Sequence, residues 1–107
     1  MKMKPQEAKY CIGQLVYDPQ FRYRGVVIDV DYHYSGSEKW YEKNAPHRPA
    51  KNQPWYHILV HNSEHRIYAA ESNLEEDKSF DPVHHPEVDY FFSEFKNGCY
   101  ILRRTGI

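Results

Sequence analysis

The stretch Tyr23-Arg-Gly-Val-Val-Ile-Asp-Val-Asp-Tyr32 decides the fold. Apolar side chains recur at every second position within it, and the intervening positions become polar toward its end. The first set is Val26, Ile28 and Val30, and the second is Val27, Asp29 and Asp31. This period of two predicts a strand with one apolar face and one increasingly polar face. Gly25 inside the strand indicates a bulge or a sharp bend, which a small barrel needs at its corners.

Other segments share the β-branched and aromatic composition of strands and end at turn residues. They are Cys11–Tyr17, Pro54–His61, Arg66–Ala70 and Cys99–Arg104. Because only Asn62–His65 separates the second from the third, these two are expected to form a hairpin. We therefore predict a mainly β fold, a small bent antiparallel barrel of about five strands with one or two short helices.

Two segments have helix signals. Ser35 followed by Glu38 fits a capping box, which predicts a helix from Gly36 to about Asn44. Pro86 suits the first position of a second helix, which is expected to run to Phe95 and to end at Asn97-Gly98. Its apolar positions fall at i, i+3, i+4 and i+7, namely Val88, Phe91, Phe92 and Phe95. This stripe is expected to cover one end of the barrel.

The chain has 107 residues, enough for one domain. We expect residues 1–9 to be a flexible N-terminal segment and residues 10–104 to form the single domain. Cys11 and Cys99 are too few for a disulfide framework and lack the spacing of a zinc or redox motif. Since no run has the roughly 18–20 apolar residues of a membrane helix, we expect a soluble, cytoplasmic protein.

The charge is unevenly distributed, although the net charge is only -1. Residues 63–95 contain nine acidic side chains against Arg66 and Lys78, whereas residues 1–27 and 96–107 are each net basic. A polyanion would therefore have to meet the N-terminal half or the last strand, because the acidic stretch would repel it.

Neither catalysis nor a metal or other cofactor is expected. The chain has no Gly-x-Ser-x-Gly elbow and no glycine-rich phosphate loop. His57 and His61 share a face of their predicted strand but stand about 13 Å apart, too far to share a metal ion. Asp29 and Asp31 could flank a site, yet two acids on the exposed side of a strand more often serve solvation. The chain is therefore interpreted as a binding protein without enzymatic activity.

The connection from Tyr34 to Gln53 is the expected binding face. It is too long for a simple connection, and it interleaves cations with aromatic rings, a composition that suits phosphates and bases. The candidate DNA- or partner-binding residues are Arg22, Arg24, Lys39, Trp40, Tyr41, Lys43, Arg48, Lys51 and Trp55. The alternative is a solvated connection in which Trp40 and Tyr41 pack on the barrel. On the binding interpretation, a Gly-Ser turn in its place would change stability by no more than about 1 kcal/mol.

Ordered phrases along the chain resemble the hemimethylated-DNA-binding (YccV-like) family, whose bacterial single-domain members are heat-shock proteins of the HspQ type. The phrases are Ile12-Gly13-Gln14-x-Val16, Arg24-Gly25-Val26-Val27-x-Asp29-x-Asp31, Gln53-Pro54-Trp55-Tyr56-His57-Ile58-Leu59-Val60, Ala70-Glu71-Ser72-Asn73-Leu74 and His85-Pro86-Glu87-Val88. They span about Cys11 to Tyr100.

The resemblance implies an SH3-like barrel and two activities. One is binding to DNA that is methylated on one strand. In the alternative activity, the chain acts during heat stress on an ATP-dependent protease such as Lon, as its adaptor, specificity factor or substrate. The chain itself would then bind DNA only weakly. The resemblance implies no catalytic residues. Short strands and many surface aromatic residues also lead us to expect a homo-oligomer.

Overall fold

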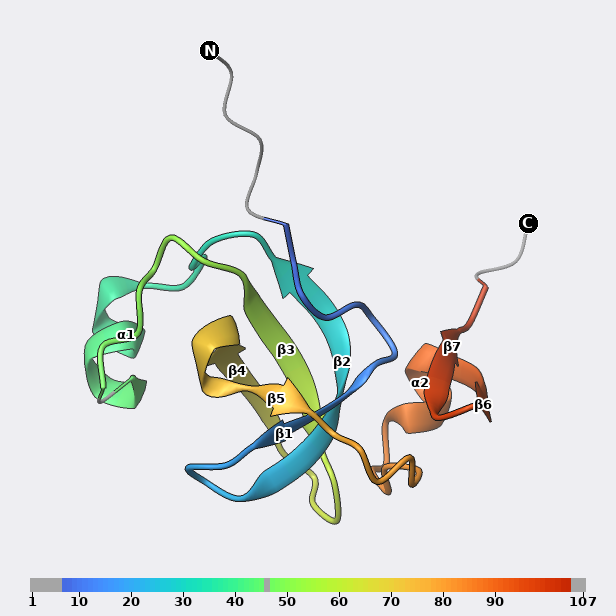
Figure 1. The fold of residues 1–107 in the computed structure, drawn as a ribbon. Coiled ribbons are helices and arrows are strands. Elements are labelled where there is room, and N and C mark those ends of the chain that lie inside the picture. The colour runs from blue at the N-terminus through green and yellow to red at the C-terminus, as the bar shows by residue number, and fades with distance from the viewer. Residues whose placement is uncertain (1–6, 46, 105–107) are drawn as a thin grey trace.

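The computed structural model describes residues 7–45 and 47–104. Five strands form one antiparallel sheet in the order β4-β3-β2-β1-β5. Their bounds are β1 Leu15–Asp18, β2 Tyr23–Asp31, β3 Trp55–Val60, β4 Arg66–Ala70 and β5 Glu75–Glu76. Figure 1 shows this sheet strongly curved. The mainly β fold class is confirmed, and the curvature is compatible with a bent barrel that is not fully closed.

Smaller elements flank the sheet at opposite ends (Figure 1). Helix α1, Glu38–Asn44, lies in the connection from β2 to β3, and a 3-10 turn, η1 Glu71–Asn73, joins β4 to β5. Beyond β5 the chain forms a single helical turn, α2 Val88–Phe91, and then a two-stranded sheet of β6 Phe92–Lys96 and β7 Cys99–Leu102.

One strand pairing and the bounds of two elements differ from the expectations. The fifth strand of the main sheet is β5, because the expected closing strand pairs with β6 instead. The expected helix from Pro86 to Phe95 is only the single turn α2, Val88–Phe91, because Phe92–Phe95 belong to β6, which pairs with β7. Asn97 and Gly98 both have positive φ, 55° and 76°, and form the hairpin turn between these strands rather than a helix end. The first strand begins at Leu15 rather than at Cys11.

Helix α1 matches the predicted range but has a different cap. The N-cap is Ser37, whose hydroxyl accepts a hydrogen bond of 3.0 Å from the backbone N–H of Trp40. Ser35 instead donates its hydroxyl to the carbonyl of His33. At the N-terminal end of the chain, residues 1–6 of the expected flexible segment lie outside the described residues. The backbone N–H of Lys9 donates to Glu71 at 2.8 Å, which anchors this residue on the barrel.

A bulge in β2 controls which side chains face outward. The register passes from Val27 opposite Ile58 directly to Asp29 opposite His57, so Ile28 is the extra residue. Val27 packs in the interior cluster, whereas Ile28 packs on the outer face. The predicted strict alternation is therefore interrupted. Gly25 is not the bulge: a Cβ there would lie 2.4 Å from the carbonyl oxygen of Leu59, so the residue allows close approach of two backbones.

Three apolar clusters stabilise the molecule. The interior of the sheet holds Tyr10, Val16, Val27, Tyr56, Ile58, Ala69 and Leu74. On the outer face, the C-terminal elements cover Leu15, Val26, Ile28 and Leu59 with Val83, Phe92 and Tyr100. At the other end of that face, α1 places Tyr41 and Ala45 against Trp55 and Ala70. No helix of the described residues is long and apolar enough to cross a membrane.

Candidate functional site

Aromatic rings from the β2–β3 connection, which includes α1, and from the sheet pack into one group, which we call the α1 aromatic cluster. Its members are Tyr34, Trp40, Tyr41, Trp55 and Tyr68. The ring centroids of Tyr34 and Trp55 are 4.9 Å apart, and those of Trp55 and Tyr68 are 5.3 Å apart. The Tyr41 hydroxyl donates to the carbonyl of Pro49 and the Trp55 indole to that of Ala50, so the connection is fastened to the sheet.

Burial separates these rings into two roles. Trp55 is 1% exposed and Tyr41 is 8% exposed, so neither can offer its ring to a partner. Trp40 is half-buried and lies beside a groove. The alternative interpretation, in which the connection packs on the barrel, therefore describes Tyr41, whereas Trp40 keeps a partly accessible ring.

A groove of about 390 Å³ runs along the outer edge of β4, between the β1–β2 turn and α1. We call it the edge groove, and its lining includes Phe21, Tyr23, Trp40, Ile67, Tyr68 and Ala69. The Tyr23 hydroxyl is buried and has no hydrogen-bond partner among the described residues. Burial first, and then the charge of Asp18, raises the pKa of Tyr23, so this hydroxyl stays protonated and can donate a hydrogen bond.

The turn at one end of the edge groove is shaped by a buried acid. Asp18 is 2% exposed, and its carboxylate accepts backbone hydrogen bonds from Gln20 at 2.9 Å and Phe21 at 3.1 Å. The Gln20 side chain also contacts the ring of His47 beyond α1. The β1–β2 turn and the connection after α1 are therefore neighbours on one surface.

The candidate cations are placed differently from one another. Arg24 is mostly shielded from solvent and bonded within the chain, since its Nε bonds Asp77 at 2.8 Å and its other nitrogens bond the carbonyls of Asp81 and Pro82. Lys51 pairs with Glu38 and lies 4.4 Å from the centroid of the Tyr41 ring. The remaining candidates are exposed: Arg22, Lys39, Lys43 and Arg48.

The exposed cations follow from local structure. Lys39 and Lys43 are four residues apart on α1, on the helix face opposite Tyr41, whose burial fixes the orientation of the helix. Arg22 and Arg48 both have positive φ, 57° and 49°, in the β1–β2 turn and in the connection after α1. The structure thus brings four of the predicted cations to the region of α1 and the β1–β2 turn.

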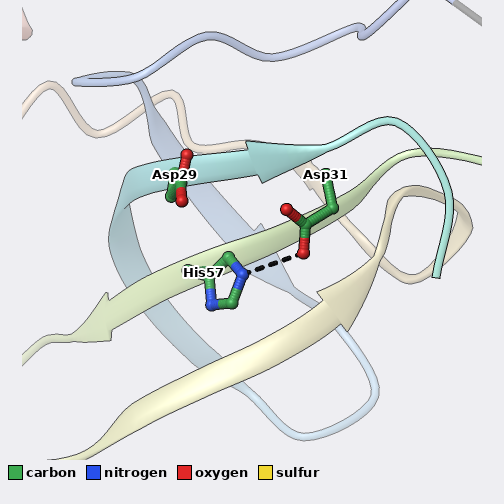
Figure 2. A group of neighbouring side chains, drawn as sticks. All are labelled: Asp29, Asp31 and His57. Carbon is green, nitrogen blue, oxygen red and sulfur yellow. Dashed lines mark hydrogen bonds and ion pairs between the residues drawn. The ribbon is translucent and has the colours of Figure 1, made fainter. Parts of the chain in front are cut away.

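A polar group lies on the outer face between the two outer clusters. His57 Nε2 is 3.0 Å from Asp31 Oδ2, and the Tyr68 hydroxyl donates to the same oxygen at 2.7 Å. Figure 2 shows Asp29, Asp31 and His57 together on β2 and β3. Burial first, and then the bond to Asp31, raises the pKa of Tyr68 to about 12. The sequence alone leaves two interpretations of Asp29 and Asp31, which could flank a site or serve solvation. Only the register and the bulge place His57 beside them.

The remaining histidines do not join this group. His61 lies against His84, with ring centroids 5.1 Å apart, and its Nδ1 accepts the backbone N–H of His84. Burial first, and then Arg24 and His84, lowers the pKa of His61, which favours the neutral ring.

A family model described as "Hemimethylated DNA-binding protein YccV like" matches residues 8–99. This covers the five-stranded sheet, α1, the α1 aromatic cluster and all nine candidate residues. The chain belongs to this family. The YccV-like match includes Arg22, Trp40 and the Asp31–His57 pair, so the surfaces described above are parts of the family's domain.

Similar sequences also occur inside larger proteins. The YccV-like chain is 30% identical over 102 residues to F-box only protein 21 of Homo sapiens and of Pongo abelii. The F-box protein of Mus musculus has the same identity over the same length. Each alignment covers 92% of this chain but 16% of the relative, so the chain spans about one sixth of the length of these proteins.

Proposed function

We propose that this chain is a non-enzymatic domain that binds hemimethylated duplex DNA. The match of the YccV-like family model to residues 8–99 is the observation that carries the proposal. The exposed cations near α1 support it, because phosphate contacts supply most of the affinity of a protein for DNA.

Arg22, Lys39, Lys43 and Arg48 are the proposed phosphate contacts. Their side chains are exposed, whereas Arg24 and Lys51 already pair with acids of the same chain. The half-buried ring of Trp40 lies on the same helix and supplies an apolar surface for the methyl group of the modified base. The acidic segment after β4 would face away from the duplex, since like charges repel.

A titration with matched duplexes tests this proposal. Unmethylated, hemimethylated and fully methylated DNA of one sequence are titrated at several salt concentrations. The Lys39→Ala and Lys43→Ala changes should each lower the salt slope by roughly 1, and Trp40→Ala should reduce the preference for the hemimethylated duplex. Lys78→Ala, an exposed cation within the acidic segment after β4, is the control. Equal affinity of the parent and the α1 variants, or no saturable binding, would refute the assignment.

A second proposed function is that of an adaptor or specificity factor for an ATP-dependent protease such as Lon, acting in the cytoplasm during heat stress. The edge groove supports it. Strand β4 ends the sheet, and an extended polypeptide can add to such an edge while its side chains enter an aromatic groove.

Degradation of a model substrate by Lon separates the two functions. Phe21 lines the groove and is 58% exposed, so Phe21→Ala should weaken any stimulation of degradation with little effect on folding. Tyr32→Ala, 55% exposed and outside the groove lining, is the matched control. If the parent protein does not change the degradation rate, the adaptor function is rejected. The expected self-association stays a prediction, and sedimentation velocity on the same samples measures it.

A further inference from the structure

The polar group on the outer face has the composition and spacing of a metal-ligand set. One ligand atom from each of Asp29, Asp31 and His57 lies within 4.8 Å of the other two. Asp29 and Asp31 come from β2 and His57 from the adjacent β3 (Figure 2). Two carboxylate oxygens and one imidazole nitrogen are a donor set that suits first-row divalent ions such as Zn²⁺.

The backbone holds these residues in place. The extra residue Ile28 shifts the alternation of β2, so that Asp29 faces outward opposite His57 in the register. Asp31 lies two residues further on and shares this face. All three side chains therefore project from paired strands rather than from loops, which limits the movement needed to close on an ion.

The existing distances are close to those of a bound state. Two ligands that bind one ion at about 2.1 Å stand about 3.0–3.4 Å apart. His57 Nε2 and Asp31 Oδ2 are 3.0 Å apart, which lies within this range. Asp29 is exposed, and one of its oxygens lies within 4.8 Å of the ligand atoms of both His57 and Asp31.

A neighbouring hydroxyl supplies the outer contact that metal ligands commonly have. Tyr68 donates to Asp31 Oδ2 at 2.7 Å, and its ring centroid is 4.5 Å from that of His57. Tyr68, on the neighbouring strand β4, therefore holds both the Asp31 carboxylate and the His57 imidazole in place. The two acids also carry two negative charges on one patch, which a divalent cation would neutralise.

We propose that Asp29, Asp31 and His57 form a binding site for one divalent transition-metal ion of the Zn²⁺ class, with Tyr68 positioning the ligands. Three protein ligands leave at least one coordination position open to solvent or to a donor atom of a partner. The proposal does not depend on DNA binding, because it rests on the geometry of these side chains alone.

Calorimetric titration of the metal-free protein with Zn²⁺, and the visible absorption of added Co²⁺, test the site. One equivalent should bind, and Mg²⁺ should not compete, since it disfavours nitrogen ligands. Tyr68→Phe should weaken Zn²⁺ about 10–100-fold, and His57→Gln and Asp29→Asn at least as much. Circular dichroism of each variant verifies that it is folded.

The matched controls are His84→Gln and Asp89→Asn, both exposed and outside the group. They should leave the affinity for Zn²⁺ unchanged. If His84→Gln lost Zn²⁺ binding and His57→Gln kept it, the ion would be bound at the His61–His84 pair instead, and the proposal would be overturned. The absence of saturable binding by the parent protein at millimolar Zn²⁺ would overturn it as well.

Discussion

Arg24 on β2 bonds Asp77, 53 residues later in the chain, with Nε and Oδ2 2.8 Å apart. The same guanidinium donates to the carbonyls of Asp81 and Pro82. It therefore fastens the acidic segment that follows β5 onto the barrel. The side chains are 20% and 9% exposed, so the pair is largely shielded from solvent. A residue that sequence reasoning assigned to phosphate binding thus has a structural role here.

Replacement of Arg24 should reduce stability rather than change electrostatic DNA binding. Arg24→Gln removes charge-assisted hydrogen bonds, each of which contributes roughly 1.5–3 kcal/mol, and it leaves a shielded carboxylate without its cation. We expect the free energy of unfolding in urea to fall by at least that amount. The salt slope of DNA binding should not change. A fall of about 1 in this slope would show that Arg24 does contact a phosphate.

Acid should remove the contribution of the same pair. Burial alone raises the pKa of Asp77, but the hydrogen bonds from Arg24 and Ser79 outweigh it, and the net pKa lies below the usual 3.8. A carboxyl with a lowered folded pKa stabilises the fold above its unfolded pKa, and this stabilisation is lost as pH falls through the folded value. Unfolding free energy measured below about pH 4 should therefore decline less steeply in Asp77→Asn than in the parent. Equal slopes would contradict the prediction.

The C-terminal elements should depend on Phe92. Its ring is 1% exposed, and its centroid is 5.1 Å from that of Tyr100. Phe92→Ala should cost about 3–5 kcal/mol, the usual range for a buried phenylalanine. Tyr90→Ala, two residues away and 76% exposed, is the matched control and should change stability by less than about 0.5 kcal/mol. Similar urea midpoints for the two variants would show that β6 is not part of the core.

The fold class could be predicted because strand composition and turns are local properties. These local properties were sufficient to predict the strands β2, β3 and β4 and the approximate range of α1. The strand at Phe92–Phe95 could not be predicted from the sequence. An apolar stripe at i, i+3, i+4 and i+7 fits a helix, and it also fits one helical turn followed by a strand. Asn97-Gly98 was read as a helix end, although this dipeptide is also the strongest short signal of a hairpin.

The candidate surface was predicted in part for a similar reason. Exposed Lys39 and Lys43 follow from the composition of the connection. The placement of His57 beside Asp31 requires the register of two strands, and a single extra residue at Ile28 decides it. No pattern within one strand reveals such a bulge, so the pair could not be recognised from the spacing of histidines.

The connection between β2 and β3 should be essential for folding. Sequence reasoning expected that a Gly-Ser turn could replace Tyr34–Gln53 at a cost of no more than about 1 kcal/mol, from closure entropy alone. In the structure, Tyr41 covers Trp55 and Ala70, and its hydroxyl bonds Pro49 at 2.8 Å. Tyr41→Ala alone should therefore cost about 3–5 kcal/mol, as for other buried aromatic residues. It should also expose the Trp55 indole, which intrinsic fluorescence measures as a red shift.

Lys43→Ala on the exposed face of α1 is the control for this experiment, because it leaves the α1 aromatic cluster intact. Its unfolding free energy should stay within about 0.5 kcal/mol of the parent. The contrast separates packing from helix propensity, since alanine favours the helix at both positions and only the Tyr41 change removes buried area. If Tyr41→Ala unfolds at the same urea concentration as Lys43→Ala, the connection is a solvated loop and can be shortened without loss of the fold.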